Sequence, residues 1–137
     1  MALRLSPYVT LPGGTARAAL EFYRSVLGGE VSISTFGEFG GVEGLDPDAV
    51  MHGQLDAPSG VTLMVSDAMP GTTSAGAGNT TLCLFGDDLD ELRTSFTGLS
   101  EGGEVTTPFE QQMWGDHYGA FTDRFGAEWM VNGGGSA

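Results

Sequence analysis

Residues 114–132 read W-G-D-H-Y-G-A-F-T-D-R-F-G-A-E-W-M-V-N, and this stretch carries the strongest fold information in the chain. Two alternating segments, His117 to Thr122 and Glu128 to Val131, predict short strands. Between them, Asp123 can accept hydrogen bonds from the turn backbone, and Gly126 can adopt a positive φ. The stretch therefore predicts a tight β-hairpin that concentrates aromatic and polar side chains.

The side chains of this hairpin have structural as well as functional interpretations. Trp129 is expected in the core, because most large aromatic residues of a small protein are buried. Trp114 adjoins a turn and is equally consistent with a core position and with the lining of a pocket for a flat or apolar ligand. Asp116 and Asp123 are each followed three residues later by glycine, so turn capping is preferred over catalysis.

Strand-like and helix-like segments precede the hairpin in a regular order. Alternating runs predict strands over residues 8–11, 30–36, 50–56, 61–66 and 81–85, and apolar residues at helical spacing predict helices over residues 16–27 and 89–99. Thr15 is expected to cap the first helix, and Asp87 and Asp88 favour the start of the second. The acidic, glycine-rich stretch from Phe36 to Asp48 is expected to be irregular, and it is consistent with a solvated loop or with a cover over a ligand.

The two predicted helices lead into the same pattern, F-x-x-x-x-x-G-G-E-V, which begins at Phe22 and again at Phe96. Aligning Gly28 with Gly102 superposes two segments with the same order of elements, so we expect an internal duplication of a βαβββ module. One such sheet cannot bury its apolar face alone, and the two sheets are expected to curve around a shared cleft. The expected fold is α+β, a single domain over residues 1–137 with modules at 1–67 and 80–132, a linker at 68–79 and a disordered tail at 133–137.

Composition excludes several classes of partner. The 137 residues include eighteen acids, five arginines and no lysine, for a formal net charge of −13, which disfavours nucleic acid and anionic membrane surfaces. The single cysteine, Cys83, excludes an intrachain disulfide and is expected to be buried and inert. Because no signal peptide or membrane span is recognisable, we expect a cytoplasmic protein.

Several motifs together resemble one known superfamily over almost the whole chain. They are P-Y-V-T-L from Pro7, A-L-E-F-Y-R-S-V-L-G-G-E from Ala19, M-H-G-Q-L from Met51, L-M-V-S-D from Leu63 and the hairpin from Trp114. The chain is similar to the vicinal oxygen chelate superfamily of glyoxalase I, bleomycin and fosfomycin resistance proteins and extradiol dioxygenases, and most closely resembles its PhnB-like proteins. Such proteins are sometimes labelled as resembling methyltransferases, but no glycine-rich nucleotide loop follows a strand here.

The resemblance implies paired βαβββ modules, a symmetric homodimer and a cleft that in many relatives holds a divalent metal on histidine and glutamate side chains. Met130 stands where metal-binding relatives place glutamate, and the first and fourth strands offer Tyr8 and Met64. Phenol and thioether groups bind Zn, Fe, Mn or Ni weakly compared with imidazole and carboxylate. We therefore expect no metal cofactor.

The candidate ligand-binding residues are Tyr8, His52, Gln54, Met64, Trp114 and His117. His52 and His117 are expected at equivalent positions of the two modules, where they could face one cleft, although ordinary local hydrogen bonding is the simpler interpretation. Gln54 shares a strand face with His52. If a metal is bound after all, its ligands are expected to be His52, His117 and Glu128. No catalytic residue can be assigned, because neither a Ser-His-Asp order nor a pair of catalytic carboxylates is recognisable.

Two functional hypotheses follow. The first is a protein that binds a small, apolar or aromatic molecule in its cleft without the usual metal, as resistance proteins of this superfamily do. The alternative is a metal-dependent lyase or dioxygenase with a non-standard ligand set. The expected partners are the small-molecule ligand and a second copy of the chain.

Overall fold

The structure is a computed structural model that describes residues 3–41, 43–44, 46–68 and 80–134. The chain forms two compact units, Met1–Ala75 and Gly76–Ala137. Within the described residues, each unit contains one four-stranded sheet and one α-helix. The division between the units falls inside the predicted linker, most of which lies outside the described residues.

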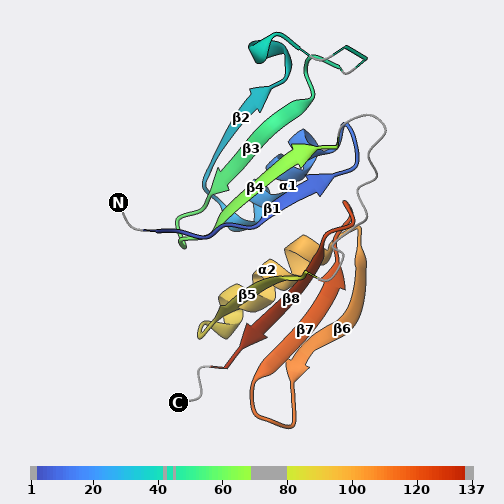
Figure 1. The fold of residues 1–137 in the computed structure, drawn as a ribbon. Coiled ribbons are helices and arrows are strands. Elements are labelled where there is room, and N and C mark those ends of the chain that lie inside the picture. Colours follow the sequence, from blue (N-terminus) through green and yellow to red (C-terminus); the bar gives the residue numbers. More distant parts are fainter. Residues whose placement is uncertain (1–2, 42, 45, 69–79, 135–137) are drawn as a thin grey trace. The chain divides into compact units, whose positions relative to one another are not determined.

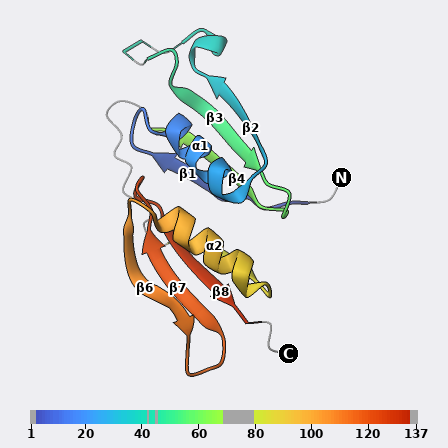
Figure 2. The ribbon, with the colours of Figure 1, turned by 180° about the vertical axis from the view of Figure 1, so that it is seen from behind.

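In the first unit, the helix covers one face of the sheet (Figure 1, Figure 2). The elements in chain order are β1 (Tyr8–Leu11), α1 (Ala16–Leu27), β2 (Glu30–Thr35), the single 3₁₀ turn η1 (Gly37–Phe39), β3 (Val50–Asp56) and β4 (Thr62–Asp67). The strand order is β1-β4-β3-β2, with β1 parallel to β4 and the other pairs antiparallel. Helix α1 packs mainly on β3.

The second unit repeats this arrangement. Its elements are β5 (Leu82–Gly86), α2 (Leu89–Ser100), β6 (Glu104–Gln111), β7 (His117–Thr122) and β8 (Glu128–Gly133). The strand order is β5-β8-β7-β6, again with one parallel pair, β5 and β8. The edge strand β6 is irregular, since its register against β7 shifts on both sides of Thr107.

The predicted α+β fold with two βαβββ modules is confirmed, and only element ends differ. Phe36 leads into η1 instead of ending β2, so the acidic stretch that follows contains one regular turn. Strands β4 and β8 each extend beyond their predicted ends, to Asp67 and Gly133. Among the described residues, no helix is long and apolar enough to cross a membrane.

The repeated G-G pair has the same geometric role in both units. Gly28 and Gly102 have φ values of 75° and 79°, which suit glycine. A Cβ atom on Gly29 would collide with the carbonyl oxygen of Asp56, and one on Gly103 would collide with that of Thr122. The repeat therefore marks the close approach of the helix exit to the end of the third strand of each module.

A buried carboxylate joins three elements of the first unit. Asp67, at the end of β4, is 5% exposed, and its two oxygens accept hydrogen bonds from the backbone N–H groups of Ala16 (2.9 Å) and Val50 (2.8 Å). The first residue of α1 and the first residue of β3 are thus held by one side chain. Thr15 does precede the helix as predicted, but its hydroxyl donates to the Pro12 carbonyl (2.6 Å) and leaves the capping to Asp67.

The predicted turn and core of the hairpin are confirmed in the second unit. Asp123 accepts hydrogen bonds from the backbone of Phe125 and Ala127 and from the indole N–H of Trp129 (2.9 Å). Trp129 is 3% exposed and stacks on Phe121, with ring centroids 6.1 Å apart. Asp123 therefore fixes both the turn and the orientation of a core side chain.

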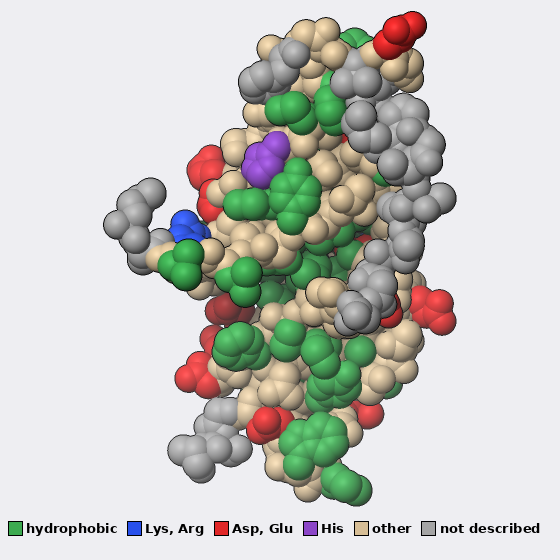
Figure 3. Space-filling model, in the orientation of Figure 1, with side chains coloured by type: hydrophobic (Ala, Val, Ile, Leu, Met, Phe, Trp, Pro, Cys, Tyr) green, Lys and Arg blue, Asp and Glu red, His purple; other side chains and the backbone are tan. Residues whose placement is uncertain are grey.

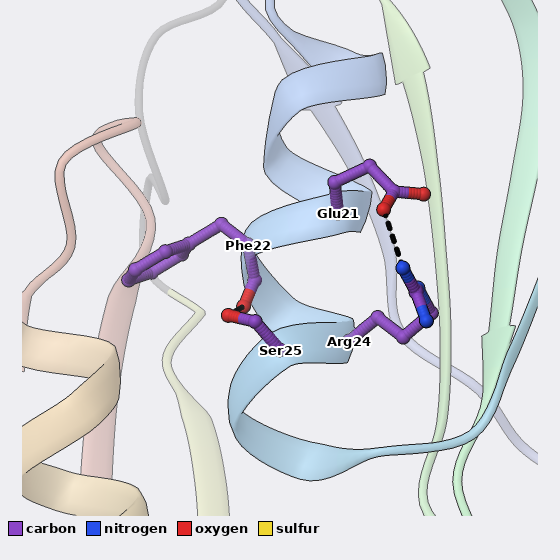
Figure 4. A network of polar contacts seen from close by, with 4 residues as sticks. All are labelled: Glu21, Phe22, Arg24 and Ser25. Carbon is purple, nitrogen blue, oxygen red and sulfur yellow. Dashed lines mark hydrogen bonds and ion pairs between the residues drawn. The ribbon is translucent and has the colours of Figure 1, made fainter.

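The outer surface of α1 carries ordinary helix-surface contacts (Figure 4). Arg24 forms an ion pair with Glu21 (2.8 Å), one turn earlier, and the Ser25 hydroxyl donates to the Phe22 carbonyl (2.6 Å). The hydrogen bond and charge of Glu21 raise the pKa of Arg24 above its ordinary value. The side chains of Glu21, Arg24 and Ser25 therefore have their polar partners within the helix itself.

Candidate functional site

Each sheet has one face covered by its helix and one face that its helix leaves open. Because side chains alternate along a strand, the buried residues Phe121, Trp129 and Val131 identify the covered face of the second sheet. Their neighbours in sequence point the other way. We call this side the second open face, and it carries Cys83, Phe85, Glu110, Tyr118, Ala120, Thr122, Glu128, Met130 and Asn132.

In the first unit, four predicted site residues lie together on the open face. Tyr8 pairs with Met64, and Met64 pairs with Gln54 on the adjacent strand. The rings of Tyr8 and His52 have centroids 5.6 Å apart. Gln54 donates to both oxygens of Asp56 (2.9 and 3.2 Å), so one of its polar groups is already used. The predicted shared face of His52 and Gln54 is thus confirmed.

The predicted equivalence of the two histidines is wrong by one residue. Gly53 lies beneath the Leu20 side chain of α1, and Gly119 lies beneath the Phe96 side chain of α2, so these glycines are the equivalent positions. The counterpart of His52 is therefore Tyr118. A one-residue slip reverses the side of the sheet on which a side chain lies, so His52 and His117 lie on different sides of their respective sheets.

His117 consequently lies on the covered face, where its ring is 5.7 Å from the Phe109 ring. Glu128 lies on the second open face, at the opposite end of the hairpin. His117 pairs with Gly133 at one end of the two strands and Glu128 pairs with Thr122 at the other, a span of about 16 Å. These two side chains cannot bind one ion, and the described residues contain no group of three His, Cys, Asp or Glu suited to a metal.

The middle row of the second open face is apolar. Cys83, Met130 and Ala120 form one row across the three strands β5, β8 and β7. Phe85 is 80% exposed at the β5 edge of this face. In Figure 3, hydrophobic side chains gather over the second unit with acidic side chains around them. A sheet face of this composition can hold the flat side of an apolar molecule.

Trp114 extends this face beyond the sheet. It is 62% exposed in the turn between β6 and β7, so the core alternative for this residue is wrong. Its ring centroid is 6.4 Å from that of Tyr118. Asp116 in the same turn accepts a hydrogen bond from Asn132 (3.4 Å) through its side chain instead of capping the turn with it. Trp114 and Tyr118 therefore form an aromatic pair at one end of the second open face.

Cys83 is exposed, contrary to the expectation of a buried thiol. Both sides of this strand are apolar, so alternation does not identify the covered side, which Leu82 and Leu84 occupy. Partial desolvation raises the pKa of the Cys83 thiol and so lowers its thiolate fraction at neutral pH.

We expect Cys83 to react with iodoacetamide in the native protein, but more slowly at neutral pH than in the urea-denatured chain. A raised pKa lowers the thiolate fraction at neutral pH, and thiolate is the reacting form. The pH midpoint of the alkylation rate should therefore lie higher in the native protein than in urea, as measured by mass spectrometry over time. Equal midpoints, or no native reaction at any pH, would contradict this assignment.

The sequence did not single out Phe85, Tyr118 or Ala120 as members of this face. Phe85 and Tyr118 look like ordinary core residues of apolar strands. Aligning the two modules on Gly53 and Gly119 gives Tyr118 the position in its module that His52 has in the first. That alignment depends on which residues the helices cover, which the sequence does not state.

Comparisons with known proteins agree with this architecture. The profile of the Glyoxalase/Bleomycin resistance protein/Dioxygenase superfamily matches residues 6–131. Protein YjdN of Escherichia coli is 29% identical, with 93% of each chain covered. The crystal structure of protein PA1353 from Pseudomonas aeruginosa is similar, with a TM-score of 0.82 and 34% identity over 97% of this chain and 98% of that one.

A PhnB protein from Bacillus cereus, described as a putative 3-demethylubiquinone-9 3-methyltransferase, has a TM-score of 0.73 at 19% identity and covers 94% of this chain and 98% of its own. At this identity the similarity concerns the fold alone.

Proposed function

Because the chain belongs to the Glyoxalase/Bleomycin resistance protein/Dioxygenase superfamily, we propose that it binds a small apolar or aromatic molecule on the second open face and uses no metal to do so. The observation that carries this proposal is the row Cys83, Met130 and Ala120, extended by exposed aromatic side chains. Large apolar side chains left in water are typical of interaction sites. Their removal from water by a ligand supplies the binding free energy.

The donor chemistry supports metal-independent binding. Met130 pairs in register with Cys83 and Ala120, so the centre of this face offers a thioether, a thiol with a raised pKa and a methyl group. On the first sheet, Met64 pairs with Tyr8 and Gln54. The first sheet also carries one imidazole, His52, beside Tyr8, but the described residues contain no group of three His, Cys, Asp or Glu of the kind that suits Zn, Fe, Mn or Ni. The residues present do not fit the divalent metal that the fold family implies.

We further propose that the protein acts as a homodimer, which the resemblance implies and which the exposed aromatic surface of the second unit supports. Light scattering in solution should then give about twice the chain mass of 14.2 kDa. A cytoplasmic location is part of the same proposal, since a chain with one exposed thiol and no disulfide suits a reducing compartment.

The test is a fluorescence titration with phenylnaphthylamine, a neutral aromatic probe. We expect the probe to bind the metal-free protein, and Met130→Glu to weaken binding at least about tenfold, because a carboxylate in the centre of the face must be desolvated by the apolar ligand. Leu5→Glu adds the same charge at an exposed residue before β1 and should leave the affinity unchanged. Bound probe should also slow the alkylation of Cys83.

Two outcomes would overturn the proposal. If the probe does not bind, or if Leu5→Glu weakens its binding as much as Met130→Glu does, the second open face is not the site. If Zn, Mn, Fe or Ni raises the melting temperature of the protein, a metal binds its native state, and the metal-independent form of the proposal fails.

A further inference from the structure

We propose that Tyr118, Trp114 and Glu110 form a subsite for an organic cation, so that the ligand of the second open face is a flat apolar molecule carrying an alkylated or aromatic ammonium group. This inference rests on the proposed function, because it specifies which class of molecule binds there. Three features of the second unit support it.

The first observation is the juxtaposition of a carboxylate with two aromatic rings. Glu110 on β6 pairs directly with Tyr118 on β7, and directly opposed residues of antiparallel strands have Cβ atoms about 5 Å apart on the same side of the sheet. The Trp114 ring lies near the Tyr118 ring, with ring centroids 6.4 Å apart and an angle of 58° between the ring planes. Aromatic faces beside a carboxylate are the arrangement that attracts alkylated ammonium groups.

The second observation is that Glu110 is not neutralised within the described part of the chain. It is exposed, and no described side chain forms an ion pair with it. A second carboxylate, Asp116, reaches the same end of the face through its hydrogen bond with Asn132.

The third observation is the placement of positive charge. The second unit contains ten acids and two arginines, Arg93 and Arg124. Arg93 lies over the Phe109 ring, whose side chain is buried under α2, and Arg124 donates to the Glu101 carbonyl at the helix exit. Neither arginine belongs to the second open face. Within the described part of the second unit, the face therefore combines an apolar row with carboxylates that neither arginine of that unit neutralises, and this combination is complementary to an apolar cation.

The experiment compares auramine O, a cationic aromatic dye, with neutral phenylnaphthylamine on two variants. We expect Glu110→Gln to lower the affinity for auramine O about threefold and to leave the affinity for phenylnaphthylamine unchanged, because only the cation interacts with the carboxylate. Glu91→Gln on α2 makes the same change in net charge away from the face and should leave both affinities unchanged. Added sodium chloride should weaken the binding of auramine O more in the wild-type protein than in the Glu110→Gln variant.

The results separate the two proposals. If neither dye binds, the proposed function fails and the cation subsite fails with it. Suppose that phenylnaphthylamine binds, but Glu110→Gln and Glu91→Gln change the affinity for auramine O equally or not at all. The cation subsite is then wrong, while the proposed function stands. Trp114→Leu provides a second check, since it keeps an apolar side chain but removes the ring. It should weaken the binding of auramine O more than the binding of phenylnaphthylamine.

Discussion

Replacing Asp67 with alanine is expected to lower the free energy of unfolding by about 3 kcal/mol, and thermal or urea denaturation would measure the loss. The carboxylate is buried and accepts two backbone hydrogen bonds, from Ala16 and Val50. Its removal leaves both N–H groups without their acceptor in a region that water does not reach freely. The start of α1 and the start of β3 lose their common anchor, so the first unit should bear the loss.

The control for this prediction is Asp87→Ala. Asp87 is also an aspartate, but it is exposed in the bend before α2, and a substitution there should change stability by no more than about 0.5 kcal/mol. Asp67→Asn keeps one acceptor oxygen, so its loss of unfolding free energy should lie between those of Asp67→Ala and Asp87→Ala. If Asp67→Ala and Asp87→Ala destabilise the protein equally, the anchoring role is refuted.

Gly103→Ala should destabilise the protein by about 3 kcal/mol, because the new Cβ has no room. It would collide with the carbonyl oxygen of Thr122 and lie 2.9 Å from the Cα and carbonyl carbon of Asp123. These are backbone atoms of the β7 end, so no side-chain rotation relieves the contact. The Asp123 turn, which holds Trp129, would have to move.

Gly86→Ala is the matched control, since a Cβ at Gly86 meets nothing within 4 Å. Gly86→Ala should change the free energy of unfolding by no more than about 0.5 kcal/mol in the same denaturation experiment. The equivalent change in the first unit, Gly29→Ala, should be at least as costly as Gly103→Ala, because its Cβ also meets backbone and its φ is 108°. A neutral Gly103→Ala would show that the helix exit can move away from β7.

The order of the elements could be predicted because each is encoded locally. The 3.6-residue period of α1, the alternation in β7 and the turn residues Asp123 and Gly126 all act between neighbours in sequence. Two copies of one pattern then made the modules recognisable. The superfamily motifs extended the prediction to the class of fold.

The facing of individual side chains could not be predicted in the same way. His117 and Tyr118 are adjacent, and which of them lies on the open face depends on Phe96 resting on Gly119. Cys83 lies in a strand whose two sides are both apolar, so alternation could not identify the exposed side. These choices are made by packing between segments far apart in sequence.

Asp67 was missed for a related reason. Its hydrogen-bond partners are at positions 16 and 50, and only the folded sheet brings them together. A sequence rule for capping considers neighbours, and therefore selected Thr15. Buried carboxylates that tie distant segments together leave no local pattern.

The irregular edge strand β6 has a consequence for aggregation. A straight edge strand presents a continuous row of unpaired N–H and C=O groups on which another chain can extend the sheet. In β6, the register shifts on both sides of Thr107 interrupt this row, Pro108 removes one donor, and Glu104 and Glu110 add like charges that repel another copy of the strand. Fibril growth from this edge is thus disfavoured, even though the neighbouring sheet face is apolar and exposed.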